Sequence, residues 1–377
     1  MLQTVMEGDE EAVHEIVDPR DAAEGAGLVY VHDDEPGITR RKAGKGWSFR
    51  KPDGSVVKDP AEIARIRKLA IPPAYTDVWI CPDPRGHIQA TGRDVKGRKQ
   101  YRYHPAFREV RDGAKYEHVT AFAEALPIIR ATVKQHMALQ GLVRSKVLAT
   151  VVYLLETTLI RVGNEDYAKH NESYGLTTLR GPHVDVHGAD LRFEFKGKSN
   201  KVWKLKLHDR RVAKIVKACH DLPGQQLFQY VDHEGQRHGV TSHDVNDYLR
   251  EITGRDITAK DFRTWAGTVL AALALSEFGA IDTAAKAKKN VRAAIERVSA
   301  RLGNTATICR KCYVHPTIVN SYMSGELLLE IKAEVDTELR ENLPQLKPEE
   351  AAVLALLERR IAHEIDGKKQ EARAKAA

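Results

Sequence analysis

The sequence has little cysteine and no long hydrophobic run. Four cysteines in 377 residues are too few for the disulfide framework of a secreted protein, so we expect a reducing, cytoplasmic environment. No apolar stretch approaches the roughly 20 residues that cross a bilayer. The first residues are acidic and lack the cationic start and apolar core of a signal peptide. These absences predict no membrane partner and a globular protein of two or three domains.

The net charge is small, but it is unevenly distributed. The chain has 59 Lys and Arg against 52 Asp and Glu, a net charge of +7. Residues 1–27 contain eight acidic side chains and one basic one, which leaves a net charge of +14 for the other 350 residues. Basic side chains exceed acidic ones by seven in residues 37–70 and by five in residues 85–103. This surplus favours a polyanionic partner, although a solvated basic face or a lipid-binding protein has the same sign.

The order of local patterns predicts an α+β fold with distinct parts. Residues 1–27 read as an acidic mobile tail. Short β-like runs separated by turn residues predict a small, mainly-β domain over 28–110, with one helix at 60–69 opened by Asp59 and Pro60. Helical spacing then predicts a mostly α-helical domain over 115–330 and a helical extension over 331–377.

A β-hairpin interrupts the helical domain. Apolar and polar residues alternate over 191–195 and 202–207, on either side of the basic segment 196–200. This alternation indicates two paired strands with a basic tip. Helices are predicted after the hairpin, including 283–302 and 316–333.

Cys309 and Cys312 have the spacing of half a zinc site. A structural zinc ion needs four ligands, and no second pair of Cys or His at metal spacing follows. We therefore interpret them as ordinary thiols and expect no metal and no cofactor.

Four separated segments of the chain, 161–167, 197–198, 260–265 and 304–313, together suit phosphodiester chemistry. Breaking a phosphodiester without a metal requires an oxygen nucleophile, fixed cations on the phosphate oxygens, and a proton donor for the leaving oxygen. Tyrosine can supply the nucleophile, arginine can span two oxygens, and lysine suits the acid. Individually the candidates are weak, because Arg161 has the place of a helix C-terminal cation and Tyr313 is one of 12 tyrosines.

Several motifs in one order resemble those of a known family. They are GRDVKGRKQYRY (92–103), LIRVGNEDYAKHN (159–171), FKGK (195–198), AKDFRTWAGT (259–268) and LGNTATICRKCYVHP (302–316). Over about residues 37–322 the chain resembles the type IB DNA topoisomerases, in particular their short bacterial and poxvirus-like members. The resemblance implies a clamp around double-stranded DNA, with a catalytic domain like that of the tyrosine recombinases. It also implies an enzyme of the nucleoid that relaxes supercoils of both signs through a 3′-phosphotyrosyl intermediate, without ATP or metal. The chemistry needs only one copy of each group, so we expect a monomer.

The resemblance assigns roles to the matching positions. Lys198 follows the turn glycine as in the family. Its neighbours Lys196 and Lys201 are alternative candidates for the same role only because they lie close to it in the sequence. Asn304 stands where viral and eukaryotic members have a histidine that hydrogen-bonds a phosphate oxygen, and an asparagine can donate such a bond but cannot titrate. The implied catalytic residues are Tyr313 as nucleophile, Arg161 and Arg263 as phosphate ligands, Lys198 as general acid, and Asn304. The implied supporting residues are Gly163, Tyr167 and Lys260, and the implied DNA contacts are Arg98, Gln100, Tyr101 and Tyr103.

Two other functions fit part of the pattern. A tyrosine recombinase shares the Arg, Lys, Arg and Tyr chemistry, but it usually has a histidine three residues before the second arginine, where this chain has Lys260. A basic DNA-packaging protein would use the same cations for backbone contacts alone and would form no covalent adduct.

Overall fold

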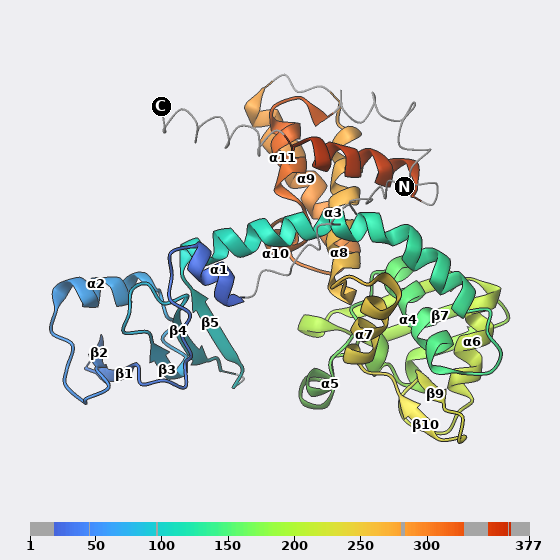
Figure 1. Cartoon of the computed structure of the whole chain (residues 1–377), viewed down its shortest axis with the longest axis horizontal. Coiled ribbons are helices and arrows are strands. Elements are labelled where there is room, and N and C mark those ends of the chain that lie inside the picture. The colour runs from blue at the N-terminus through green and yellow to red at the C-terminus, as the bar shows by residue number, and fades with distance from the viewer. Residues whose placement is uncertain are drawn as a thin grey trace, which may run out of the picture. The chain divides into compact units, whose positions relative to one another are not determined.

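A computed structural model describes residues 19–44, 46–95, 97–279, 283–327, 346–360 and 362. The chain divides into two compact units, with the boundary after Glu117. The first unit is built on a β-sheet, and the second is mostly helical (Figure 1). The predicted mixture of a mainly-β N-terminal part and a helical C-terminal part is confirmed.

The first unit contains a five-stranded antiparallel sheet in the order β2-β1-β3-β4-β5. Helix α2 (Pro60–Lys68) begins where predicted, because the Asp59 carboxylate accepts a hydrogen bond from the Ala61 backbone N–H and Pro60 needs no donor partner. The strands are β1 (Ile38–Ala43), β2 (Gly46–Arg50), β3 (Thr76–Ile80), β4 (Ile88–Arg93) and β5 (Lys99–Tyr103).

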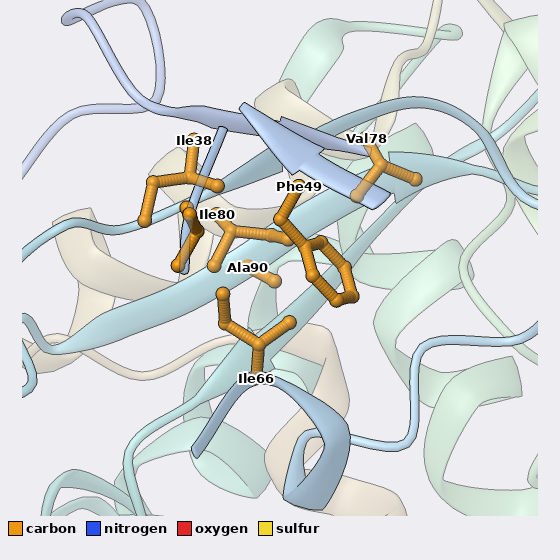
Figure 2. Packing of buried hydrophobic residues seen from close by; sticks show 7 residues of the cluster. Ile38, Phe49, Ile66, Val78, Ile80 and Ala90 are labelled. Carbon is orange, nitrogen blue, oxygen red and sulfur yellow. The ribbon is translucent and has the colours of Figure 1, made fainter. Parts of the chain in front are cut away.

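The core of this sheet lies on the face covered by α2. Ile66 of the helix packs with apolar side chains of the first four strands, and Figure 2 shows these side chains pointing toward one another. Burying each large apolar side chain contributes about 1.5–3 kcal/mol. The labelled members of the cluster are Ile38, Phe49, Ile66, Val78, Ile80 and Ala90.

The structure differs from the predicted mobile tail over the last residues of that segment. Residues 1–18 lie outside the described ranges, but Pro19–Gly25 form helix α1. Its Ala23 is fully buried against Leu28 and Phe107. A proline at the first helical position and this small apolar contact favour the helix despite the acidic composition.

The second unit consists of helices and two small sheets (Figure 1). The long helix α3 (Pro105–His136) crosses the boundary between the units. The other helices are α4 (Arg144–Thr158), α5 (Glu165–Asn171), α6 (Arg210–His220), α7 (Ser242–Thr253), α8 (Ala259–Ser276), α9 (Ala284–Leu302), α10 (Ala306–Tyr313) and α11 (Pro316–Met323). The strands are β6 (Val184–His187), β7 (Asp190–Lys196), β8 (Val202–His208), β9 (Gln229–Val231) and β10 (Arg237–Gly239).

The predicted hairpin is confirmed as β7 and β8. Lys196 pairs with Val202, so residues 197–201 form its tip, and β6 completes a three-stranded antiparallel sheet. Every second residue of β7 is buried, as the alternation indicated.

One predicted helix near the end of the unit differs from the structure. The helix predicted over 316–333 ends at Met323, because the chain turns at Gly325, whose φ of +81° suits glycine. Of the predicted helical extension over 331–377, residues 348–360 form a helix that contacts α3, and residues 331–345, 361 and 363–377 lie outside the described ranges. The Glu350 carboxylate of this helix accepts two hydrogen bonds of 2.8 Å from Arg130, which also pairs with Glu156 at 2.7 Å.

None of the helices in the described ranges has the length and apolar composition needed to span a membrane.

Candidate active site

Tyr313 is the last residue of α10, and helix α8 holds it in place. A Cβ added at Gly267 of α8 would lie 3.1 Å from the Tyr313 Cβ and would collide with the Tyr313 carbonyl oxygen. Two residues further, the His315 backbone N–H donates a 3.1 Å hydrogen bond to the buried Thr268 hydroxyl. The glycine and the threonine therefore fix the backbone on which the tyrosine is presented.

Arg263, near the start of α8, is buried, with only 3% of its surface exposed. It donates to the Leu159 carbonyl at the end of α4 and, at 2.6 Å, to the Leu302 carbonyl at the end of α9. Both carbonyls lie at helix C-termini, where the helix dipole favours a cation. These partners orient the guanidinium without a carboxylate to neutralise it.

The charges of the two predicted phosphate ligands influence one another. Burial and, secondarily, the like charge of Arg161 lower the pKa of Arg263 to about 10, while Tyr313 opposes that shift. Burial also lowers the pKa of Arg161, again opposed by Tyr313. Arg263 nevertheless remains charged at neutral pH, so the site holds two neighbouring cations.

Tyr313 lies beside both arginines. Its ring centroid lies 5.1 Å from the Arg263 Cζ, and it opposes the lowering of the pKa of both Arg161 and Arg263. The structure thus brings the predicted nucleophile and both predicted phosphate ligands into one cluster.

Asn304 completes this cluster on the side of Arg161. It follows Gly303, the C-terminal cap of α9, and its side-chain oxygen accepts a hydrogen bond from the Arg161 guanidinium. The Asn304 Nδ2 is buried and has no hydrogen-bond partner among the described residues, and the same is true of the Arg263 Nε. Buried donors without partners are rare in folded proteins, and each is available to an incoming oxygen ligand.

The segment that carries Arg161 is bonded to the chain around Gly175. The Leu176 N–H donates to the Arg161 carbonyl at 2.9 Å. Gly163 has a φ of +109°, and a Cβ there would lie 2.9 Å from the Thr177 Oγ1. Gly163 therefore lies where it can support the position of Arg161.

The remaining predicted residues lie outside this cluster. Lys198 is exposed at the hairpin tip, while its rival Lys196 pairs with Glu172 at 3.8 Å. None of the hydrogen bonds or ion pairs among the described residues joins Lys198 to Tyr313 or to either arginine. Lys260 is exposed on the first turn of α8, and Tyr167 lies on α5 with its side chain outside the described part.

The two cysteines of α10 lie close to the cluster. Cys309 is fully buried, and burial raises its pKa to about 11, which Arg263 opposes. In the described ranges, no group of three or more His, Cys, Asp and Glu side chains is placed to hold a metal.

The predicted DNA contacts lie together in the first unit, on β5 and the turn before it. Asp94 binds the guanidinium of Arg98 at 2.6 Å and accepts a 3.2 Å hydrogen bond from the Gln100 amide. The rings of Tyr101 and Tyr103 are stacked, with centroids 5.8 Å apart. Because β5 is an edge strand, these residues form one row at the border of the sheet, with the Gln100 side chain on the face opposite to Tyr101 and Tyr103.

Sequence reasoning did not assign roles to Gly267 and Thr268. A usable signal was present, because residues four apart lie on the same helix face and Gly267 is four positions after Arg263. The role of the Leu159 and Leu302 carbonyls has no sequence signal, since any residue type supplies a carbonyl.

Comparison with known proteins identifies the family. The family profile described as the eukaryotic DNA topoisomerase I catalytic core matches residues 104–357, and that of the bacterial DNA topoisomerase IB N-terminal domain matches residues 46–94. The chain is 30% identical over 304 residues to DNA topoisomerase 1B of Acanthamoeba polyphaga mimivirus, covering 78% of this chain and 90% of that protein. It is 22% identical over 262 residues to DNA topoisomerase 1B of Vaccinia virus (strain Copenhagen), covering 67% and 80%.

The matched catalytic core and the relatives together define an isomerase that acts on DNA. The chain belongs to the type IB DNA topoisomerases.

Proposed function

We propose that Tyr313 is the nucleophile of a transient, single-strand DNA cleavage. The observation that supports this is the place of the Tyr313 ring, 5.1 Å from the Arg263 Cζ and close enough to Arg161 to influence its pKa. Two fixed cations beside a hydroxyl form a site for a phosphate group that the hydroxyl attacks.

The proposed step exchanges one phosphodiester for another. The Tyr313 oxygen forms a bond to the scissile phosphorus, its proton passes to water, and the bond from phosphorus to the 5′ oxygen breaks. The leaving 5′ oxygen takes a proton, and the DNA 3′ end stays attached to Tyr313. Rotation of the free strand relaxes supercoils of either sign, and reversal of the same step reseals the strand. Bond energy is retained throughout, so ATP is not required.

The arginines would stabilise the negative charge that grows on the non-bridging oxygens. Arg263 is held by neutral carbonyls, so its charge is not cancelled before DNA binds. The unpartnered Asn304 Nδ2 adds a neutral donor. Fixed donors of this kind supply the charge stabilisation that a metal ion provides elsewhere.

Lys198 is proposed as the acid that protonates the 5′ oxygen. Its place on an exposed hairpin tip lets it reach the leaving group when DNA is bound.

We further propose that residues 28–110 and 115–330 are separate DNA-binding domains that close as a clamp on duplex DNA, the second like the catalytic domain of tyrosine recombinases. The row on β5, from Arg98 to Tyr103, provides cations and aromatic rings for the phosphates and base edges. One copy of the chain contains every proposed group, which favours a monomer.

The test is relaxation of supercoiled plasmid in EDTA. The wild-type protein is expected to relax both supercoil signs and to yield a covalent complex when SDS is added. Tyr313→Phe, which removes one oxygen, is expected to abolish both. Tyr230→Phe, the same change on β9, is the matched control and is expected to stay active. An active Tyr313→Phe protein contradicts the assignment.

A further inference from the structure

Trp203 connects two segments that carry groups of the proposed mechanism. It lies on β8 and is 8% exposed. Its indole contacts Gly197, the residue before Lys198, and also Gly303, the residue before Asn304. One side chain thus bridges the hairpin tip and the turn between α9 and α10.

The contacts of the indole with both glycines leave no room for a side chain larger than hydrogen. A Cβ added at Gly197 would lie 2.7 Å from the Cδ1 and Nε1 of the five-membered ring of Trp203. A Cβ added at Gly303 would lie 2.5 Å from the Cζ2 of its six-membered ring. The indole therefore packs directly against two backbone segments and limits how they can move relative to one another.

The hairpin holds the indole on its own side. The ring of Phe195 lies nearly parallel to the indole, with an interplanar angle of 4° and centroids 6.3 Å apart. The Gly197 N–H donates a 2.8 Å hydrogen bond to the Lys201 carbonyl, which closes the tip around Lys198. The base of the tip is thus rigid, although the Lys198 side chain is exposed.

The other segment belongs to the phosphate site. Gly303 caps α9 in the left-handed conformation, with a φ of +63°, and Asn304 then contacts Arg161. A change in the separation of these segments would move Lys198 relative to the arginines by the same amount. Displacements of about 1 Å can cost 10²-fold in rate.

We propose that Trp203 is a positioning residue that sets Lys198 at the correct distance from the phosphate site. The proposal rests on the proposed function, because it requires Lys198 to act as the general acid. It assigns Trp203 no contact with DNA.

The test compares two leaving groups in single-turnover cleavage by the full-length protein. One duplex has the natural bridging 5′ oxygen at the scissile phosphate, and the other has sulfur there. A thiolate leaves without a proton, since thiols have a pKa near 8.5, so the sulfur duplex does not need the acid. Removal of a general acid typically costs about 10²–10⁴-fold on the oxygen duplex.

Trp203→Ala is expected to slow cleavage of the oxygen duplex by about 10²-fold and to leave cleavage of the sulfur duplex within about threefold of wild type. Trp203→Phe, which keeps a ring against Phe195, is expected to give the same pattern with about a 10-fold loss. Phe228→Ala, a buried aromatic control in the same unit, is expected to lower thermal stability without discriminating between the duplexes.

The outcomes separate the two proposals. Suppose that the sulfur duplex restores cleavage by Lys198→Ala, but both Trp203 variants cleave the two duplexes equally slowly. The positioning role of Trp203 is then wrong, while the proposed function stands. If sulfur does not restore Lys198→Ala, the proposed acid itself is wrong, and the role of Trp203 fails with it. Arg263→Ala must remain slow on both duplexes, because it acts on the phosphate and not on the leaving group.

Discussion

Two arginines of this chain, one in each unit, are held in opposite ways. Arg263 in the second unit is buried and donates to two backbone carbonyls. Arg98 in the first unit is partly exposed and is paired with the Asp94 carboxylate at 2.6 Å. A carbonyl orients a guanidinium and leaves its charge in place, whereas a carboxylate cancels it. The cluster around Tyr313 thus holds a cation that none of the described carboxylates pairs with, whereas the cation at the edge of the β-sheet is paired with a carboxylate.

The largest expected effect on DNA cleavage comes from removing the charge of Arg263. Arg263→Ala should slow single-turnover cleavage about 10³-fold, because a fixed donor to the developing phosphate charge is lost. It should also lower stability, since two buried carbonyls lose their partner. Arg297→Ala, an exposed arginine paired with Glu277, is the control and should cleave normally. A loss below 10-fold for Arg263→Ala would show that its charge is not used in the reaction.

The next effect should come from the packing behind Tyr313. Gly267→Ala places a methyl group against the Tyr313 backbone and should slow cleavage about 10–100-fold by moving the phenol away from the arginines. DNA affinity, measured separately by filter binding, should change little. Ala266→Ser, on a partly exposed position of the same helix, is the matched control. Equal cleavage rates for Gly267→Ala and wild type would mean that α10 can shift without moving the Tyr313 phenol out of place.

A smaller effect, on DNA affinity, is expected at Arg98, whose charge is paired with Asp94. Asp94→Asn keeps the shape of the turn and removes the negative charge beside Arg98, so DNA affinity at low salt should rise about two- to fivefold. Arg98→Ala should lower affinity and reduce the slope of log K against log salt by about one. Asp53→Asn removes a charge from another turn of the first unit and controls for net charge. Weaker binding by Asp94→Asn would show that Asp94 positions Arg98 instead of neutralising it.

The contrast between the two arginines could not be predicted from the sequence. The alternation in β7 and the Asp59-Pro60 signal predicted a hairpin and a helix correctly, because such patterns depend on neighbouring residues. The partners of Arg263 lie 104 and 39 positions away and are backbone atoms, which carry no residue signature.

Helix α10, which carries Tyr313, could not be predicted from the sequence either. It is short, and its start depends on the Thr305 hydroxyl accepting from the Ile308 N–H and on its packing against α8 and α9. The motifs placed Tyr313, Arg161 and Arg263 in one site by resemblance, and their contacts follow from the tertiary structure alone.

The smallest predicted effect concerns the pair of His118 with the Asp261 carboxylate, near the start of α8. The hydrogen bond to Asp261 raises the pKa of His118, although burial opposes this. A raised folded-state pKa means that the stabilisation is complete below about pH 6.5 and is lost as the pH rises through the folded-state value. Because a third of the His118 side chain is exposed, we expect a few tenths of a kcal/mol. The Tm of wild type should exceed that of His118→Gln at pH 6 and converge with it at pH 9, whereas the exposed control His233→Gln should show no such convergence. A gap that widens with pH would mean that neutral His118 is the stabilising form.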